Sequence, residues 1–445
     1  MPDSYFQVSD HGTNKVLTPH AMSQYTLWRL KNQLLFPRLA RRNFEPIFAE
    51  DIIGDHVSVK RPYYAFIGKG RVITDADFNK LVDQSVDIKI DQRPRGAMMF
   101  NDEERTMDIM DFGDRYLQSM VEEIAEQYDI DGGRELGNGF FMNEISSSSL
   151  DFDGASKIAR QAVEMSIPIS SNNYAILNPS DVESLGEALQ GSNAANSRPG
   201  FDIPSGTVEQ SRIREAYQGK LKRYHVFESV HIPYYETVSL HASAAPKVNA
   251  PSGYVGSELP TDGWGNNAQQ ILKKGNIIQL AGVNQVMVRT GTDEKRETGR
   301  VASFVVTEDV SCSASGAATI PIYPAINDGT LNVNGVVYKA GKNVSAKPAN
   351  NAVVTVLGAA KGSAKRRKQS VFYNRDALEY IQIRLVAPQS ALRSGVSHDP
   401  ESGVTIMFLE DFVLKTVETQ LRADAFYGVK NIYPEIGIRY IGEEF

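Results

Sequence analysis

The sequence predicts an α+β fold, because helix-type and strand-type patterns occupy separate stretches of the chain. Met110, Leu117, Val121, Ile124 and Tyr128 recur at helical spacing and form one apolar stripe. From Thr261 to Leu357, short runs of Val, Ile, Phe and Thr alternate with Gly, Asn, Asp and Pro turns, which indicates a small all-β module. A chain of 445 residues has room for two or three such domains.

The composition is that of a folded, soluble protein without an internal disulfide framework. Hydrophobic residues make up 41% of the chain and charged residues 23%, which argues against disorder. The formal net charge of −7 excludes nucleic-acid binding driven by net attraction. The single cysteine, Cys312, excludes an internal disulfide and fits a reducing cytoplasm. We expect no signal peptide, because the polar N-terminus lacks an apolar core, and no membrane span.

The N-terminal region is predicted to be an arm followed by a helix. Residues 1–16 are polar and show no periodicity, whereas Thr18-Pro19 is a good helix start. From there Met22, Tyr25, Leu30, Leu34 and Leu35 lie on one face, and Arg38, Arg41 and Arg42 follow. These arginines either complement the helix dipole or contact a partner.

Two strand-like segments predict an extended hairpin arm. Residues 57–60 and 86–90 alternate with period two and are separated by a long polar connection. An unsupported two-stranded ribbon is only marginally stable, so we expect the arm to lie on an adjacent subunit. Lys60, Arg61, Lys69 and Arg71 give this arm positive charge.

The apolar stripe belongs to a long helix that follows the arm. Asn101 and Glu104 form a capping-box pattern at its start, and Asp131-Gly132-Gly133 is predicted to end it. A second helix is predicted over 152–165, with Ile158, Ala162 and Met165 on one side. Residues 174–179 read as a buried strand that leads into a turn or short helix.

Several short segments of the sequence resemble segments of one protein family. The words DGW, KKGNIIQLAGV, FVVTEDV and SAKPANNAVVTVLG resemble the domain inserted in major coat proteins of short-tailed phages of the P22 type. VFYNRDALEYIQIRLVAP resembles the family's return strand, and RADAFYGVKNIYPEIGIRYIG its closing strands. The resemblance covers nearly the whole chain, is strongest at 261–385 and 423–442, and is weakest before residue 56.

The resemblance implies the Hong Kong 97 capsid fold with an inserted β-barrel-like domain. The implied parts are an N-terminal arm (1–55), the hairpin arm (56–100), spine helix and peripheral domain (101–168), axial domain (169–240 and 366–403), inserted β domain (241–365) and closing peripheral strands (404–445). We further expect residues 262–362 to fold alone, because the strands of the insertion pair locally.

The function implied by the resemblance is structural. Such a protein forms hexamers and pentamers of itself and closes them into an icosahedral shell around double-stranded DNA, with non-specific interior contact to that DNA. Its other implied partners are a scaffolding protein and a portal protein, with a decoration protein left open. The expected location is the virion capsid, after assembly in the host bacterial cytoplasm. Two alternatives remain: an encapsulin-like compartment shell, and an enzyme whose catalytic residues lie on separated loops.

The motifs that would indicate enzyme chemistry are absent from the sequence. The chain has no GxxxxGK[ST] phosphate loop, no HExxH zinc pair and no GxSxG nucleophile elbow. His225, His231 and His241 come nearest to a cluster, and we assign them to packing or hydrogen bonding. The sequence therefore predicts no catalytic residue, cofactor or metal.

The predicted functional residues are basic assembly contacts. They are Arg38, Arg41, Arg42, Lys60, Arg61, Lys69, Arg71, Lys365, Arg366, Arg367 and Lys368. The basic stretch 361–368 has three interpretations: a solvated linker, an inter-subunit salt bridge, or contact with an acidic partner such as a scaffolding protein.

Overall fold

The structure of the protein is a computed structural model. It describes residues 34–41, 56–61, 85–101, 118–168, 170–190, 217–265, 268–287, 296–333, 336–338, 341–382, 393–398, 404–413, 415 and 418–444. The chain divides into two units. The first comprises residues 1–59, 87–132 and 378–430, and the second comprises residues 60–86, 133–377 and 431–445.

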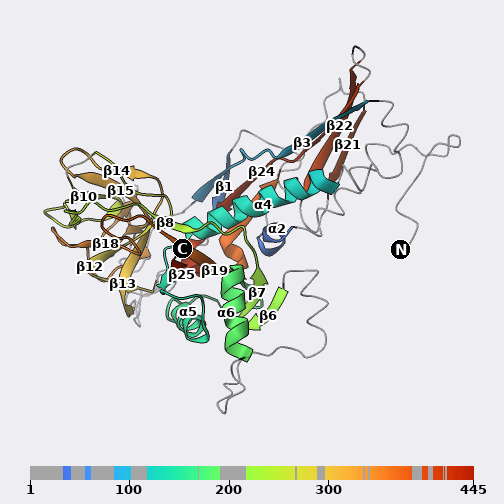
Figure 1. Ribbon diagram of the computed structural model, residues 1–445. Coiled ribbons are helices and arrows are strands. Elements are labelled where there is room, and N and C mark those ends of the chain that lie inside the picture. Colours follow the sequence, from blue (N-terminus) through green and yellow to red (C-terminus); the bar gives the residue numbers. More distant parts are fainter. Residues whose placement is uncertain are drawn as a thin grey trace, which may run out of the picture. The chain divides into compact units, whose positions relative to one another are not determined.

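A mixed sheet forms the centre of the second unit (Figure 1). Its strand order is β4-β25-β19-β5-β7-β6, and β8 pairs with the start of β19. The bounds are β4 Asn143–Ile145, β5 Asn173–Leu177, β6 Tyr217–Leu221, β7 Tyr224–Glu228, β8 Tyr235–Thr237, β19 Lys365–Asn374 and β25 Gly437–Glu444. The β5–β7 and β25–β4 pairs are parallel, and the other pairs are antiparallel.

Two helices accompany this sheet, and each begins at a clear start signal. Asp151 caps α5 (Phe152–Glu164) by accepting a hydrogen bond from the Gly154 backbone N–H at 2.6 Å. Ile158, Ala162 and Met165 are buried, as the sequence predicted. Helix α6 (Pro179–Gln190) starts directly after β5, which confirms the predicted strand-to-helix turn.

A six-stranded antiparallel sheet curls into a barrel within the second unit. Its order is β18-β12-β13-β15-β10-β9. The bounds are β9 Lys247–Val248, β10 Gly256–Asp262, β12 Ile277–Val286, β13 Glu297–Val306, β15 Ala318–Ile326 and β18 Val354–Val356. A bridge from Lys247 in β9 to Val353, which directly precedes β18, joins the first and last strands of the sheet. The sheet therefore leaves no long unpaired edge between these two strands. Two short pairs lie beside the barrel: β11 (Gln270–Leu272) with β14 (Val310–Ser311), and β16 (Asn332–Val333) with β17 (Val336–Val337).

The barrel interior explains the sequence word DGW. Trp264 is fully buried, and its indole N–H donates to Thr261 Oγ1 at 2.8 Å. Gly263 between them has φ +78°, a conformation that L side chains rarely adopt. Phe304 and the aliphatic side chains of β10, β12, β13 and β15 complete the core.

The first unit contains a separate four-stranded antiparallel sheet, in the order β21-β22-β23-β3. The bounds are β3 Arg95–Asn101, β21 Arg393–His398, β22 Thr405–Val413 and β23 Glu418–Asp424. Strand β20 (Leu378–Gln382) pairs with β24 (Tyr427–Asn431), and helix α2 spans Phe36–Leu39. Two turns of 3-10 helix, η7 (Arg375–Ala377) and η8 (Pro434–Ile436), lie in the second unit.

The long helix α4 spans Gln118–Gly139 and continues beyond its predicted end. Asn101, the predicted cap, belongs to β3, while residues 102–117, including Leu117, lie outside the described part. Ile124 and Tyr128 are buried as expected. The helix continues through Gly132-Gly133, because these glycines serve close packing. A methyl group at Gly133 would overlap the His231 backbone carbonyl.

The α+β class predicted from the sequence is confirmed by these sheets and helices. Strands β1 (His56–Lys60) and β2 (Ser85–Lys89) pair with each other, as expected for the base of a hairpin. The predicted helix from Thr18 lies outside the described residues, except that Leu34 and Leu35 precede α2. Strand β25 pairs with β19 in the central sheet.

Candidate functional site

The predicted assembly residues lie in three parts of the fold. Arg38 and Arg41 belong to the segment around α2, Lys60 and Arg61 end strand β1, and residues 365–368 begin strand β19. Arg42, Lys69 and Arg71 lie outside the described residues. The first part belongs to the first unit, and the other two belong to the second.

Arg61 lies in a partly buried polar cluster, which we call the arm-root node: Arg61, Tyr323 and Glu435. Its Nη2 donates to Tyr323 Oη at 2.6 Å and pairs with Glu435 Oε2 at 2.7 Å. Its Nε donates to the Ile432 carbonyl at 2.9 Å, and the Tyr323 hydroxyl donates to Glu435. The guanidinium also lies 5.0 Å from the centre of the Tyr433 ring. The node joins the end of β1 to barrel strand β15 and to η8.

The electrostatics of the node favour the charged guanidinium. Burial alone would lower the pKa of Arg61, but the Glu435 carboxylate and Tyr323 outweigh burial and raise it. Burial, followed by the charge of Glu435, raises the pKa of Tyr323 well above its ordinary value. The side chains of Arg61 and Glu435 are only 11% and 10% exposed, so solvent screens this pair weakly.

The β1–β2 pair has one buried face and one exposed face. Val57, Val59 and Ile88 are buried, whereas Ser58 and Lys60 face solvent. The Ser58 hydroxyl donates to Asp87 across the two strands. Lys60 thus presents its charge at the exposed side of the hairpin base, while its neighbour Arg61 turns into the protein.

The arginines around α2 have local roles in the described structure. Arg38 is exposed in the last turn of α2, where its charge complements the helix dipole. The Arg41 backbone N–H donates to the Leu378 carbonyl at 2.8 Å. The segment is further held by Asp129 of α4, which accepts backbone N–H groups from Phe36 at 3.0 Å and from Leu35 at 3.2 Å. Burial raises the pKa of Asp129 to about 7, although these two hydrogen bonds oppose the rise.

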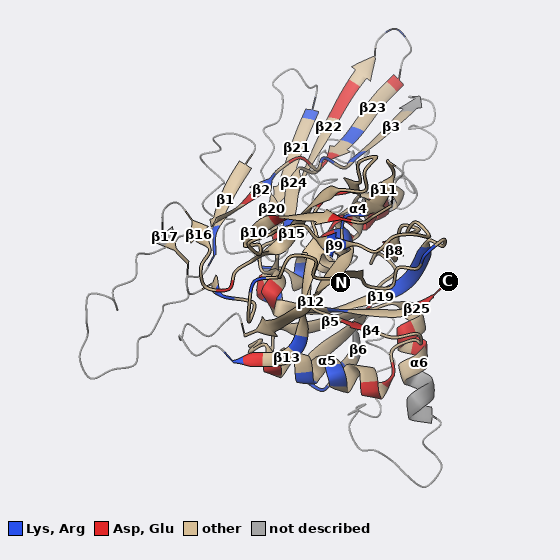
Figure 2. Cartoon of the chain, turned by 90° about the vertical axis from the view of Figure 1, so that its left-hand side faces the viewer, with Lys and Arg blue, Asp and Glu red and all other residues tan. Residues whose placement is uncertain are grey.

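The basic stretch is not a linker over residues 365–368, because these residues form the first part of β19. Lys365 and Arg367 pair with Glu444, Lys368 pairs with Glu443 at 3.2 Å, and Arg366 pairs with Glu236 at 3.2 Å. Figure 2 shows this end of β19 in blue close to the chain's C-terminus. The acidic partners are therefore within the same chain, on β25 and β8.

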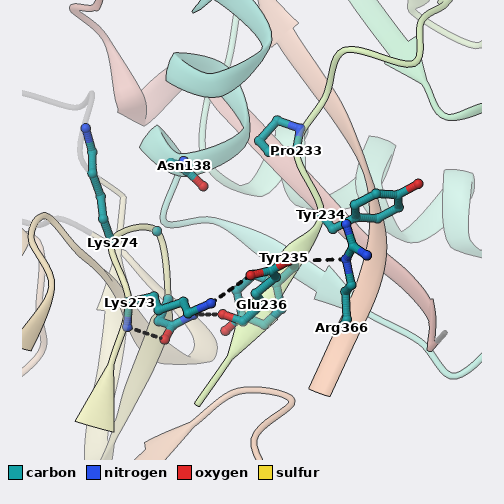
Figure 3. A pocket seen from close by; sticks show the side chains of 10 residues that line it. Asn138, Pro233, Tyr234, Tyr235, Glu236, Lys273, Lys274 and Arg366 are labelled. Atoms are coloured by element: carbon teal, nitrogen blue, oxygen red, sulfur yellow. Dashed lines mark hydrogen bonds and ion pairs between the residues drawn. The ribbon is translucent and has the colours of Figure 1, made fainter. Parts of the chain in front are cut away.

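A cavity of about 370 Å³ lies where the barrel meets the central sheet (Figure 3). Glu236 in this cavity pairs with both Lys273 Nζ, at 2.7 Å, and Arg366. The hydrogen bond from Lys273 lowers the pKa of Glu236. Arg366 also stacks 4.1 Å from the Tyr234 ring centre. Because Lys273 of the barrel and Arg366 of the central sheet share the Glu236 carboxylate, these ion pairs connect the barrel to the sheet.

The seam between barrel and central sheet has an apolar centre and a charged rim. Tyr235, Ile277 and Ile441 are buried together at the centre. The Tyr235 hydroxyl donates to the Leu357 carbonyl at 2.8 Å and accepts from the Ile277 N–H at 3.1 Å. On the rim, Arg300 lies 3.5 Å from Glu144 and 3.3 Å from Glu164. The barrel is thus attached by packing as well as by its two chain connections.

The KKGN turn of the barrel meets the C-terminal end of α4. Gly275 has φ +90° and lies against Asn138, while Lys274 lies 3.7 Å from Glu135. The last turn of α4 contains no basic residue of its own. Lys274 supplies positive charge at the helix end, where the dipole favours it.

Within the described ranges, no group of three or more His, Cys, Asp or Glu side chains could hold a metal ion. Cys312 is buried, as expected for a small residue in a β-rich segment. No described helix is long and apolar enough to cross a membrane.

Sequence reasoning missed Arg439, which is fully buried in β25. Its Nη1 donates to the Gly137 carbonyl of α4 at 2.6 Å, while Nε and Nη2 have no hydrogen-bond partner within the described residues. Burial lowers the pKa of Arg439 to about 10. The one available signal was its position in the apolar run GIRYIG, where an arginine interrupts a strand expected to be buried.

Comparison with known families bears directly on the predicted role. Residues 264–442 match the family model described as P22 coat protein, gene protein 5. The match covers most of the barrel, strand β19 and the C-terminal strands. Within the barrel it includes most of the sequence segments that resemble the inserted domain. This part of the chain is thus similar to a phage coat protein family.

Solved structures similar to the chain include three from phages. A Mycobacterium phage Che8 structure has 11% identity and a TM-score of 0.41, covering 92% of this chain and 90% of that one. The capsid of Ralstonia phage GP4 has 10% identity and a TM-score of 0.41, covering 98% and 95%. The capsid of cyanophage P-SCSP1u has 9% identity and a TM-score of 0.40, covering 99% and 93%. Among curated proteins, no sequence match was found.

Proposed function

We propose that this chain is the major capsid protein of a tailed phage and encloses the phage genome by repeated contacts between copies of itself. Residues 264–442 carry the match to the P22 coat protein family. The family match is the observation that carries the proposal. It concerns the part of the chain that includes barrel strands, β19 and β25, which are joined through the seam described above.

The proposed mechanism is heterologous contact between subunits. The hairpin arm, based on β1 and β2, and the N-terminal arm would each lie over a neighbouring subunit and close hexamers and pentamers. The exposed edges β3 and β21 of the four-stranded sheet would be covered in the shell, where an uncovered edge invites uncontrolled pairing.

The finer roles belong to the same proposal. Partners would be a scaffolding protein, a portal protein and packaged double-stranded DNA, the latter through non-specific interior contact, with assembly in the host bacterial cytoplasm. Arg38, Arg41, Arg42, Lys60, Lys69 and Arg71 remain proposed assembly contacts. Arg61 and residues 365–368 would contribute less, because their charges have partners within the subunit. The chain would perform no reaction.

Electron microscopy of the purified protein tests the proposal and separates its alternatives. A capsid protein forms large closed shells that accommodate a phage genome. A compartment protein of the encapsulin type forms small shells with protein cargo, and an enzyme with dispersed catalytic residues forms none. Folded protein without shells, in the presence of a scaffolding protein from the same source, would contradict the proposal.

A further inference from the structure

The arm-root node connects the hairpin arm to the inserted barrel within one subunit. Arg61 comes directly after β1, Tyr323 lies in barrel strand β15, and Glu435 lies in η8. We propose that this node makes the barrel a regulator of the arm, because β15 supplies the Tyr323 hydroxyl that bonds to both charged members of the node. The inference rests on the proposed function, in which the arm contacts a neighbouring subunit.

The geometry makes the three side chains depend on one another. The Tyr323 hydroxyl accepts from Arg61 Nη2 and donates to Glu435, while Arg61 also pairs with the same carboxylate. Each group therefore satisfies two others in a closed triangle. Removing Arg61 or Glu435 leaves the other charge in a poorly solvated place, which is far more costly than losing an exposed ion pair. Removing the Tyr323 hydroxyl keeps the Arg61–Glu435 pair but takes one hydrogen bond from each of these two charges.

The node fixes the orientation of the Arg61 side chain as well as its position. Arg61 Nε donates to the Ile432 carbonyl, and the guanidinium lies against the rings of Tyr323, at 5.6 Å, and Tyr433. A planar guanidinium with these donors and stacking partners has one fitting orientation. Lysine could keep the charge but not this set of contacts.

The consequence is a coupling between barrel and arm. If β15 shifts or its hydroxyl is lost, the Arg61 side chain loses one member of the triangle, and the end of β1 is released more often. Local opening of this kind is visible as faster hydrogen exchange of backbone amides.

The test compares hydrogen exchange in unassembled full-length wild type, Tyr323→Phe and Tyr254→Phe. Tyr254 is the matched control, since its hydroxyl accepts a hydrogen bond from the Glu258 N–H at the barrel surface. We expect amides of β1 and β2 to exchange about tenfold faster or more in Tyr323→Phe. They should be unchanged in Tyr254→Phe, and β12 and β13 should be unchanged in both.

Arg61→Lys keeps the test decisive if Tyr323→Phe loosens the barrel itself. This variant changes no barrel residue, so faster exchange at β1 with normal exchange at β12 and β13 would support the coupling. Wild-type exchange at β1 and β2 in both Arg61→Lys and Tyr323→Phe would overturn it, while shell formation by the wild type would still uphold the capsid role. Failure of the wild type to form shells would instead contradict the proposed function.

Discussion

The buried carboxylate of Asp129 holds the backbone of the N-terminal segment in place. It accepts the backbone N–H groups of Leu35 and Phe36, which would otherwise be left without partners at the start of α2. Burial nevertheless raises its pKa to about 7. The group therefore titrates near neutral pH, where most aspartates are fully ionised.

The raised pKa predicts how stability depends on pH. Between the unfolded pKa of about 4 and the folded pKa of about 7, the native state holds a proton that the unfolded state has released. The contribution of Asp129 to the free energy of unfolding is thus fully present below about pH 4 and is lost as pH rises through 7. Its slope is at most about 1.4 kcal/mol per pH unit.

The Asp129→Asn variant should lack this contribution. Denaturant unfolding at pH 4.5, 6 and 8 should show the wild type losing stability relative to the variant as pH rises. Parallel curves for the two proteins would mean that Asp129 is already ionised in the folded state throughout this range.

Thr261 supports the barrel through one hydroxyl. That hydroxyl accepts from the buried Trp264 indole and donates to the Ala318 carbonyl at 2.8 Å. Thr261→Val keeps the shape but leaves the indole N–H unsatisfied, at a cost of about 1–3 kcal/mol in the free energy of unfolding. Thr307→Val is the control, because the Thr307 hydroxyl is exposed and makes only a 3.4 Å contact. Equal losses in the two variants, measured by denaturant unfolding, would contradict this role.

At the scale of elements, the barrel is closed by strands that lie outside the 262–362 fragment. Strands β9 and β10 precede it almost entirely, and β9 makes the bridge that joins both ends of the sheet. We therefore revise the expectation that residues 262–362 fold alone, because this fragment lacks β9 and nearly all of β10. A fragment of residues 241–365 includes all six strands.

The two fragments should behave differently in isolation. Residues 241–365 are expected to give a dispersed amide NMR spectrum and a cooperative thermal transition. Residues 262–362 should give a collapsed spectrum, because they lack two of the six strands. A folded short fragment would show that β9 and β10 are dispensable for the barrel core.

Local patterns predicted the elements better than they predicted their ends and partners. The period-two strands and the capped helix α5 were confirmed, because their signals lie within a few residues of sequence. Gly132-Gly133 suggested a helix end, but tertiary packing uses both glycines inside α4. One interpretation of residues 361–368 was a solvated linker, but residues 365–368 form a strand that pairs with β8 and β25. The domain boundaries stay predictions.

The candidate site shows the same limit. Arg61 and its partners Tyr323 and Glu435 are 262 and 374 residues apart in sequence. No periodicity connects such positions, so the sequence could indicate a basic arm but not which of its charges is buried. Lys60 and Arg61 are neighbours, yet one faces solvent and the other completes the node.

At the scale of the whole molecule, we expect the charges that stabilise the subunit to be different from the charges that join subunits. Reversing Lys69 and Arg71 to Glu should leave thermal unfolding of the subunit nearly unchanged, since exposed pairs contribute about 0–1 kcal/mol. Shell formation should nevertheless fail or slow. Arg61→Glu is the contrasting variant and should lower the melting temperature, because it places two carboxylates in the node. A lower melting temperature for the Lys69 and Arg71 reversal, with normal shells, would place the arm within its own subunit.

The central claim is that copies of this chain close a shell through arms that lie on neighbouring subunits. A cryo-electron microscopy reconstruction of the assembled particle tests it most directly, because each arm can be traced from its root at Arg61. We predict an icosahedral lattice of hexamers and pentamers in which the segment between β1 and β2 crosses onto the adjacent subunit. Particles in which that segment folds back onto its own subunit, or protein that is folded but forms no closed lattice, would contradict the account.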